Sequence, residues 1–95
     1  MSEYAKFFRK ARRGKDITQT ELARLLDFRS GQLISNIERG ISFYPLNRLP
    51  QVVKILDLEI EPVLSLILRI EEKNLRRIFK TKNPVGLIKP SKPDL

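Results

Sequence analysis

Apolar side chains recur at intervals of three and four residues in five successive segments of this chain. That spacing places them on one face of an α-helix, so each segment predicts an amphipathic helix that can contribute to a shared core. Short breaks separate the segments. Gly14 is expected to close the first, and a T-x-x-E capping box at Thr18–Glu21 is expected to start the second. We therefore expect an all-α fold. The predicted helices cover residues 4–13, 18–27, 30–39, 47–57 and 61–80.

The composition excludes several classes of protein. Ninety-five residues allow one small domain, and the absence of Cys and His rules out disulfides, zinc fingers, thiol nucleophiles and imidazole bases. The carboxylates are scattered, so we expect no enzyme, no metal and no cofactor. The longest apolar run, residues 63–68, is too short to span a bilayer, and Arg9 and Lys10 interrupt any export leader. A soluble protein of the cytoplasm, associated with the nucleoid, is expected.

The net charge of +8 is distributed unevenly. Residues 1–16 and residues 61–95 each carry a net +4, whereas residues 17–60 are balanced, with five basic and five acidic side chains. A basic excess of this kind favours polyanionic partners or solubility. The flanks, rather than the centre of the chain, are therefore expected to contact a phosphate backbone.

The segment RSGQLISNIERG, Arg29 to Gly40, separates polar from apolar side chains around a predicted helix. Ile34 and Ile37 lie on one face, and the opposite face is polar. We expect Ser30 to be the N-cap and Gly40 to follow the helix end. Such a face can simply be solvated, but Gln and Asn are also the side chains that make paired hydrogen bonds to adenine. The polar face comprises Gln32, Ser35, Asn36 and Arg39.

The last two predicted helices differ in how much apolar surface they carry. Asn47 is expected to cap the fourth helix, with Pro50 in its first turn. The fifth carries two apolar stripes, although a helix at the edge of a small domain needs only one. We expect the second stripe to form an interface; the alternative is that both are buried in one copy. The first stripe is Val63, Ile67 and Ile70, with Leu66 and Ile78 widening the total, and the second is Leu64, Leu68, Leu75 and Phe79. Residues 81–95 predict a flexible basic tail.

Two short motifs carry a resemblance to a known family. T-Q-T-E-L-A at Thr18–Ala23 and I-S-N-I-E-R-G at Ile34–Gly40, within residues 5–58, resemble the phage repressor and Cro family of helix-turn-helix proteins, also called the xenobiotic-response-element type. The resemblance implies a repressor-like fold with a helix-turn-helix DNA-binding domain over residues 1–60. The long C-terminal helix at 61–80, expected to dimerise through its second apolar stripe, completes the five helices, and the tail at 81–95 follows. The expected turn between its two central helices contains Asp27 where the family usually has Gly. Asp tolerates a left-handed conformation, so we expect the turn to form.

The resemblance also assigns roles to individual residues. The third helix would lie in the major groove, and basic residues around it would contact phosphates. Arg12 would pair with Glu38 to brace the motif. Ala23 would allow the two helices to cross closely, while Leu33 would touch a thymine methyl or support the turn. The implied base-reading positions are Gly31, Gln32, Ser35 and Asn36, and the implied phosphate contacts are Gln19, Arg13, Lys15, Arg39 and Arg48, with Arg9 and Lys10 as further candidates.

These observations favour a sequence-specific transcriptional regulator, expected to be a repressor, that binds double-stranded DNA as a homodimer at a pseudo-palindromic operator. Two alternatives remain. One is an antitoxin or other interaction module that neutralises a partner protein and regulates its own promoter. The other is a nucleic-acid scaffold that uses its charge without sequence preference, for which affinity would depend on salt and scarcely on sequence.

Overall fold

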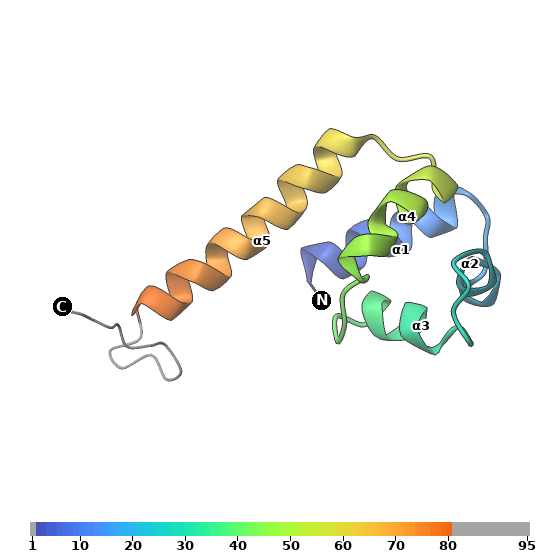
Figure 1. The fold of residues 1–95 in the computed structure, drawn as a ribbon, viewed down its shortest axis with the longest axis horizontal. Helices are drawn as coiled ribbons and strands as arrows, with labels where there is room; N and C mark the ends of the chain where they lie inside the picture. The colour runs from blue at the N-terminus through green and yellow to red at the C-terminus, as the bar shows by residue number, and fades with distance from the viewer. Residues whose placement is uncertain (1, 81–95) are drawn as a thin grey trace.

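The computed structural model describes residues 2–80, which contain helices and no strand, so the all-α prediction is confirmed there. The predicted tail at 81–95 lies outside the described residues. We call α1 to α4 the head; α5 packs on the head with its first half and projects away from it with its second (Figure 1). The elements are α1 (Glu3–Gly14), α2 (Gln19–Leu25), α3 (Gln32–Glu38), the short 3₁₀ helix η1 (Leu46–Arg48), α4 (Leu49–Ile55) and α5 (Ile60–Lys80).

The core of the head forms where α1, α2 and α3 meet. Ala23 is 1% exposed, and its small side chain lets the backbones of α2 and α3 approach closely. Ile34 and Ile37 are fully buried, as the spacing of the third helix predicts. The buried cluster comprises Tyr4, Phe8, Leu22, Ala23, Leu26, Ile34, Ile37, Tyr44, Val52, Leu56, Val63 and Leu66.

Aspartates terminate three of the helices. Asp16, Asp27 and Asp57 have φ values of 60°, 62° and 55°, in the left-handed region that Asp tolerates better than most other residues. The prediction for Asp27 is confirmed. The prediction that Gly14 closes α1 is wrong, because Gly14 is still helical and the left-handed residue is Asp16. Gly40, with φ 81°, follows α3 as predicted.

The capping box of α2 is complete. The Glu21 amide donates to the Thr18 hydroxyl at 3.0 Å, and the Thr18 amide donates to the Glu21 carboxylate at 2.8 Å. These two bonds satisfy amides that an α-helix leaves without partners at its start. The hydrogen bonds from Thr18 lower the pKa of Glu21 below its usual range.

The starts of α3 and α4 differ from the sequence expectations. Gly31, rather than Ser30, is the N-cap of α3, and the Ser30 hydroxyl accepts from the Gln32 amide at 3.2 Å in a local turn. Asn47 is not the cap of α4 but lies within η1, and Arg48 occupies the N-cap position. Arg48 is held there by contacts distant in sequence, which local patterns do not reveal: its guanidinium donates to the Leu26 carbonyl at 2.7 Å.

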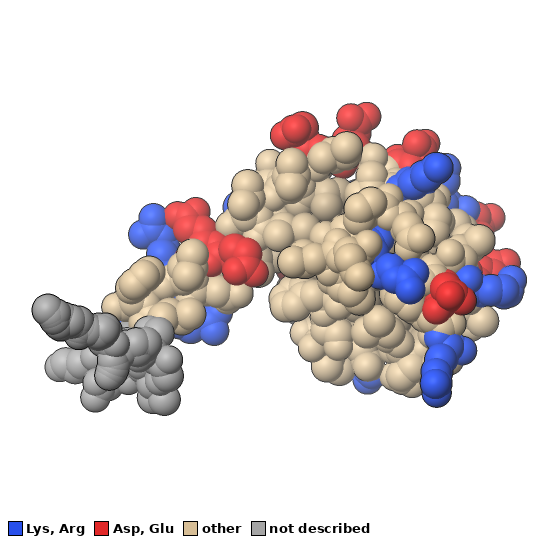
Figure 2. All heavy atoms as spheres, in the orientation of Figure 1, with Lys and Arg blue, Asp and Glu red and all other residues tan. Residues whose placement is uncertain are grey.

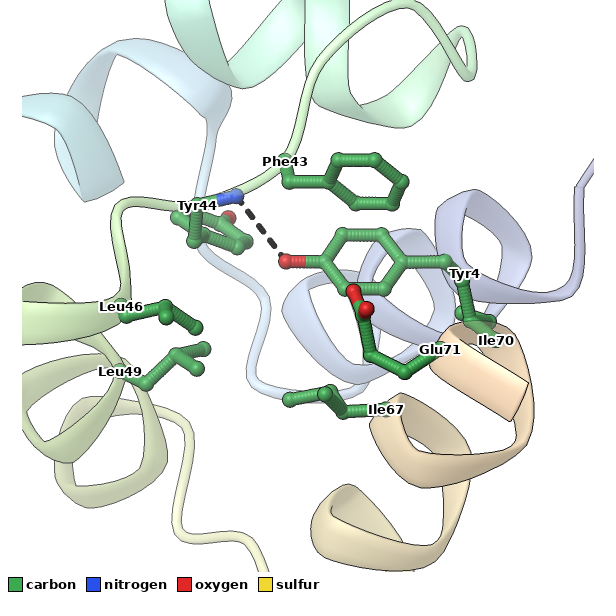
Figure 3. A pocket seen from close by; sticks show the side chains of 8 residues that line it. All are labelled: Tyr4, Phe43, Tyr44, Leu46, Leu49, Ile67, Ile70 and Glu71. Carbon is green, nitrogen blue, oxygen red and sulfur yellow. Dashed lines mark hydrogen bonds between the residues drawn. The ribbon is translucent and has the colours of Figure 1, made fainter. Parts of the chain in front are cut away.

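The loop that follows α3 is fastened to α1 by aromatic side chains. The Tyr44 amide donates to the Tyr4 hydroxyl at 2.9 Å, the bond drawn in Figure 3. Phe43 packs edge-on against Tyr4, with ring centroids 4.7 Å apart. Beneath these rings, a cavity of about 180 Å³ separates the loop from Ile67 and Ile70 of α5 (Figure 3). The packing between α5 and the head is therefore incomplete on this side.

One face of α5 joins the core. Val63 and Leu66 are buried, and Ile67 and Ile70 are partly buried against the same cluster. Leu66 is thus a core residue of the first stripe, a stronger role than the sequence assigned to it. The alternative in which both stripes are buried in one copy is wrong, because the second stripe is exposed along its whole length.

Candidate nucleic-acid interface

The start of α3 lies against the start of α2. A Cβ built on Gly31 would meet the Thr20 amide nitrogen and hydroxyl at 3.4 Å, which is ordinary contact distance. Gly31 therefore marks a close approach of the two backbones, and Ala23 marks the second, buried one. At both positions a small side chain lets α2 and α3 pack closely against each other.

The outward face of α3 carries a connected row of polar side chains. The Gln32 side-chain amide donates to Asn36 Oδ1 at 3.0 Å, and Arg39 donates to the same oxygen at 2.6 Å. Gln32 is exposed, and Ser35 and Asn36 are partly exposed beside it. Gln32 Oε1 and Asn36 Nδ2 make no hydrogen bond within residues 2–80, so the two linked amides keep one acceptor and one donor unengaged. Leu33 is partly buried against the core and supports the helix from beneath.

A buried ion pair braces this arrangement, as predicted. Arg12 Nε and Nη2 donate to the two Glu38 carboxylate oxygens at 2.7 and 2.9 Å, and Arg12 Nη1 donates to the Ile17 carbonyl at 2.6 Å. Arg12 is 8% exposed and Glu38 is 3% exposed. The bonds to Glu38 raise the pKa of Arg12. The pair joins the end of α1 to the end of α3 and keeps the only ionisable side chain of α3 away from solvent.

Two more polar side chains surround this pair. The Gln19 amide donates to Glu38 Oε1 at 3.1 Å, so the side chain predicted to bind phosphate is engaged by the brace in this structure. The hydroxyl of Tyr44 is buried and has no hydrogen-bond partner among residues 2–80. Burial raises the pKa of Tyr44, and the charge of Glu38 raises it further. Sequence patterns gave no signal that either side chain lies beside the pair, because the pair and its neighbours come from different elements.

The predicted phosphate contacts fall into two groups. Arg13, Lys15 and Arg39 are exposed, and Lys15 makes only a long surface pair with Asp57 at 3.9 Å. Arg48 is different. Its guanidinium bonds to the Leu26 carbonyl and to Gln51, and it lies 5.7 Å from the Phe28 ring centroid. Its role within the head is to tie the end of α2 to α4, and phosphate binding by Arg48 stays a prediction.

The outer surface of α1 carries a basic stripe. Arg9, Lys10 and Arg13 line a shallow hollow together with Lys6, which the sequence expectations did not include. The sequence could have indicated that Lys6 belongs to this stripe, because Lys6, Lys10 and Arg13 follow the spacing of one helical face. Figure 2 shows a largely uncharged surface over α3, bordered by basic and acidic side chains.

The residues predicted for dimerisation share one exposed face of α5. They are Leu64, Leu68, Leu75 and Phe79. Among residues 2–80, no group of His, Cys, Asp and Glu could hold a metal ion, and no helix is long and apolar enough to cross a membrane. The chain matches no protein-family model, and no curated protein or solved structure is significantly similar to it.

Proposed function

We propose that this protein is a sequence-specific DNA-binding transcriptional regulator, acting as a repressor, that inserts α3 into the major groove. The observation that carries the proposal is the outward face of α3. It presents amide and hydroxyl groups at the surface, while the only ionisable side chain of the helix, Glu38, is buried in the brace.

The chemistry of this face suits a base edge. Adenine offers an acceptor at N7 and a donor at N6 in the major groove, and Asn or Gln can pair with both. Gln32 and Asn36, linked through a hydrogen bond between their amides, carry one unengaged acceptor and one unengaged donor. Solvated helix faces are usually rich in long charged side chains. A short helix held by a buried ion pair, whose outward face carries amides and a hydroxyl with Arg39 as its one flanking charge, is better explained by close contact with a base edge.

Charge around the face supports the same function. Arg39 follows α3 directly and is exposed, and Arg13 and Lys15 lie at the end of α1. In this proposal, these side chains contribute affinity that depends on salt but not on sequence, and α3 contributes the discrimination. The resemblance of the two motifs to the phage repressor and Cro family assigns the same division of roles.

A single head offers few base contacts, so we propose that the protein acts as a homodimer on a pseudo-palindromic site. Two copies of α3 would then enter successive major grooves about 34 Å apart. The exposed apolar face of α5 supports this assembly, because apolar patches of this kind usually mark interfaces.

The test is selection of bound fragments from a randomised duplex pool at about physiological salt. The wild type is compared with the double variant Gln32→Ala, Asn36→Ala and with Ser65→Ala, an exposed position on α5. We expect a two-fold symmetric motif for the wild type and Ser65→Ala, and a degraded motif for the double variant. Enrichment without a motif, or a motif unchanged in the double variant, would refute base recognition by α3.

A further inference from the structure

The exposed apolar stripe of α5 lies on a different side of the helix from the buried one. Its centre is about 155° around the helix axis from the face formed by Val63, Leu66 and Ile70. The head therefore cannot cover it. The exposed fractions are 46% for Leu64, 65% for Leu68, 50% for Leu75 and 79% for Phe79.

The order of these residues is symmetric about the middle of the helix. Leu68 and Leu75 are equally distant in sequence from the midpoint between Glu71 and Glu72, and so are Leu64 and Phe79. When two identical helices pair antiparallel about a two-fold axis, residues at equal distances on either side of that axis face each other. We propose that two copies of this chain pair through α5 in antiparallel orientation, with Leu68 facing Leu75 and Leu64 facing Phe79 across the axis. This inference rests on the homodimer of the proposed function and specifies its interface.

The charges of α5 favour this orientation over a parallel one. Residues 60–72 carry three acidic side chains and one basic, whereas residues 73–80 carry four basic side chains and none that is acidic. Antiparallel pairing brings the acidic half of one copy beside the basic half of the other, and it also opposes the helix dipoles. A parallel pair would place like charges together along the whole helix.

The surface beside Leu64 provides a place for the partner's end. An apolar hollow of about 380 Å³ lies between α4 and the start of α5, with Leu64 on its edge. In the antiparallel register, Phe79 of the second copy arrives opposite Leu64, at the edge of this hollow. Parallel pairing would bring a second Leu64 there instead and leave Phe79, the most exposed of the four, at the far end. The hollow is lined by Leu46, Leu49, Pro50, Val53, Ile60, Val63, Leu64 and Ile67.

Glu71 and Glu72 flank the proposed axis, where carboxylates from both copies approach. Glu72 is already compensated, because Arg76 lies 2.8 Å from it within the same helix. Arg69 also projects on the Glu72 side of the stripe, where in a single copy it pairs with Glu3 of α1 at 2.5 Å. The centre of the interface is therefore polar: the Glu72 flank is compensated within each copy, whereas the Glu71 flank has no ion pair among residues 2–80.

Disulfide trapping tests the register, and the chain is suited to it because it contains no cysteine. Single variants Leu68→Cys and Leu75→Cys are oxidised alone and as an equal mixture, with one variant carrying a tag that separates mixed from self-linked products on a non-reducing gel. In the proposed register, position 68 of one copy meets position 75 of the other. The two copies of position 68 are about 10 Å apart along the helix axis, and so are the two copies of position 75. A disulfide requires Cα atoms roughly 4.4 to 6.8 Å apart. Leu25→Cys, exposed on α2, measures collisional linkage.

We expect the mixed product, at twice the 11.1 kDa of the chain plus the mass of the tag, to form to at least tenfold excess over the Leu25→Cys background. A mixture of Leu64→Cys and Phe79→Cys should also form the mixed disulfide in preference to self-linked products. Efficient self-linkage of Leu68→Cys would overturn the register in favour of a parallel pair. Absence of all linkage in a protein that light scattering finds dimeric would place the interface elsewhere, and a monomer would overturn the proposal.

These experiments are done without DNA, so they are independent of base recognition. Mixed linkage together with failed motif selection would refute the proposed function and leave the interface standing. A symmetric DNA motif together with failed linkage would refute the interface alone.

Discussion

Replacing Glu38 by Gln removes one charge from the brace between α1 and α3 and leaves the other in place. Arg12, 8% exposed, would keep its bond to the Ile17 carbonyl but lose its charged partner, and the Gln amide would place a donor against the guanidinium. Breaking a buried pair by removing one partner costs roughly 3–5 kcal/mol. A domain of this size has a total stability of about 5–12 kcal/mol, so the loss is a large fraction of it.

The free energy of unfolding is measured by urea denaturation followed by circular dichroism, with Lys15→Gln as the control. That variant breaks the exposed pair between Lys15 and Asp57 and should cost less than about 1 kcal/mol. The double variant Arg12→Met, Glu38→Met should recover much of the loss, because it leaves no buried charge without a partner. If Glu38→Gln costs no more than Lys15→Gln, the pair does not brace the head and the reasoning is refuted.

The remaining predictions concern single positions. Asp27→Val should cost about 1–2 kcal/mol in urea denaturation because φ is 62° there, whereas Asp27→Gly should stay close to the wild type; equal effects would contradict the backbone argument. Thr18→Ala should cost about 1 kcal/mol through the lost cap. Because the pKa of Glu21 is lowered in the folded state, its contribution is present above its unfolded pKa of about 4.3 and is lost as the pH falls through the folded value; Glu21→Gln should flatten the acid limb of stability against pH. Tyr44→Phe removes a buried hydroxyl that has no partner among residues 2–80, so the free energy of unfolding should stay the same or rise by about 1 kcal/mol. A fall of more than about 1 kcal/mol would show that the hydroxyl has a partner. Leu68→Glu should yield monomers by light scattering and weaken DNA binding; an unchanged dimer would place the interface elsewhere.

Local patterns predicted those elements whose determinants are close together in sequence. The capping box at Thr18 and Glu21 formed as expected because both of its bonds span three residues. The buried face of α3 followed from its periodicity. The left-handed turn at Asp27 was also predictable, since few other residues accept that conformation at low cost.

The errors arose where distant residues decide the local conformation. Ser30 lost the N-cap position because the chain reaches α3 through a turn in which Gly31 lies against Thr20, on another helix. Arg48 displaced Asn47 as the cap of α4 because its side chain reaches back to the Leu26 carbonyl. The engagement of Gln19 by Glu38 likewise joins residues 19 positions apart.

Dimerisation and DNA binding would be linked under the proposed function. The exposed stripe of α5 gives a single copy an apolar surface that association removes from water, and one head offers only a short row of base contacts. Joining two heads makes the second binding event intramolecular, so the affinity of the pair can greatly exceed that of either head. Occupancy of a symmetric site would then rise more steeply than linearly with protein concentration while the protein is mostly monomeric. A substitution on α5, far from α3, would weaken DNA binding through the dimer equilibrium alone, and raising the protein concentration would restore it; a substitution of Asn36 would not be rescued in this way.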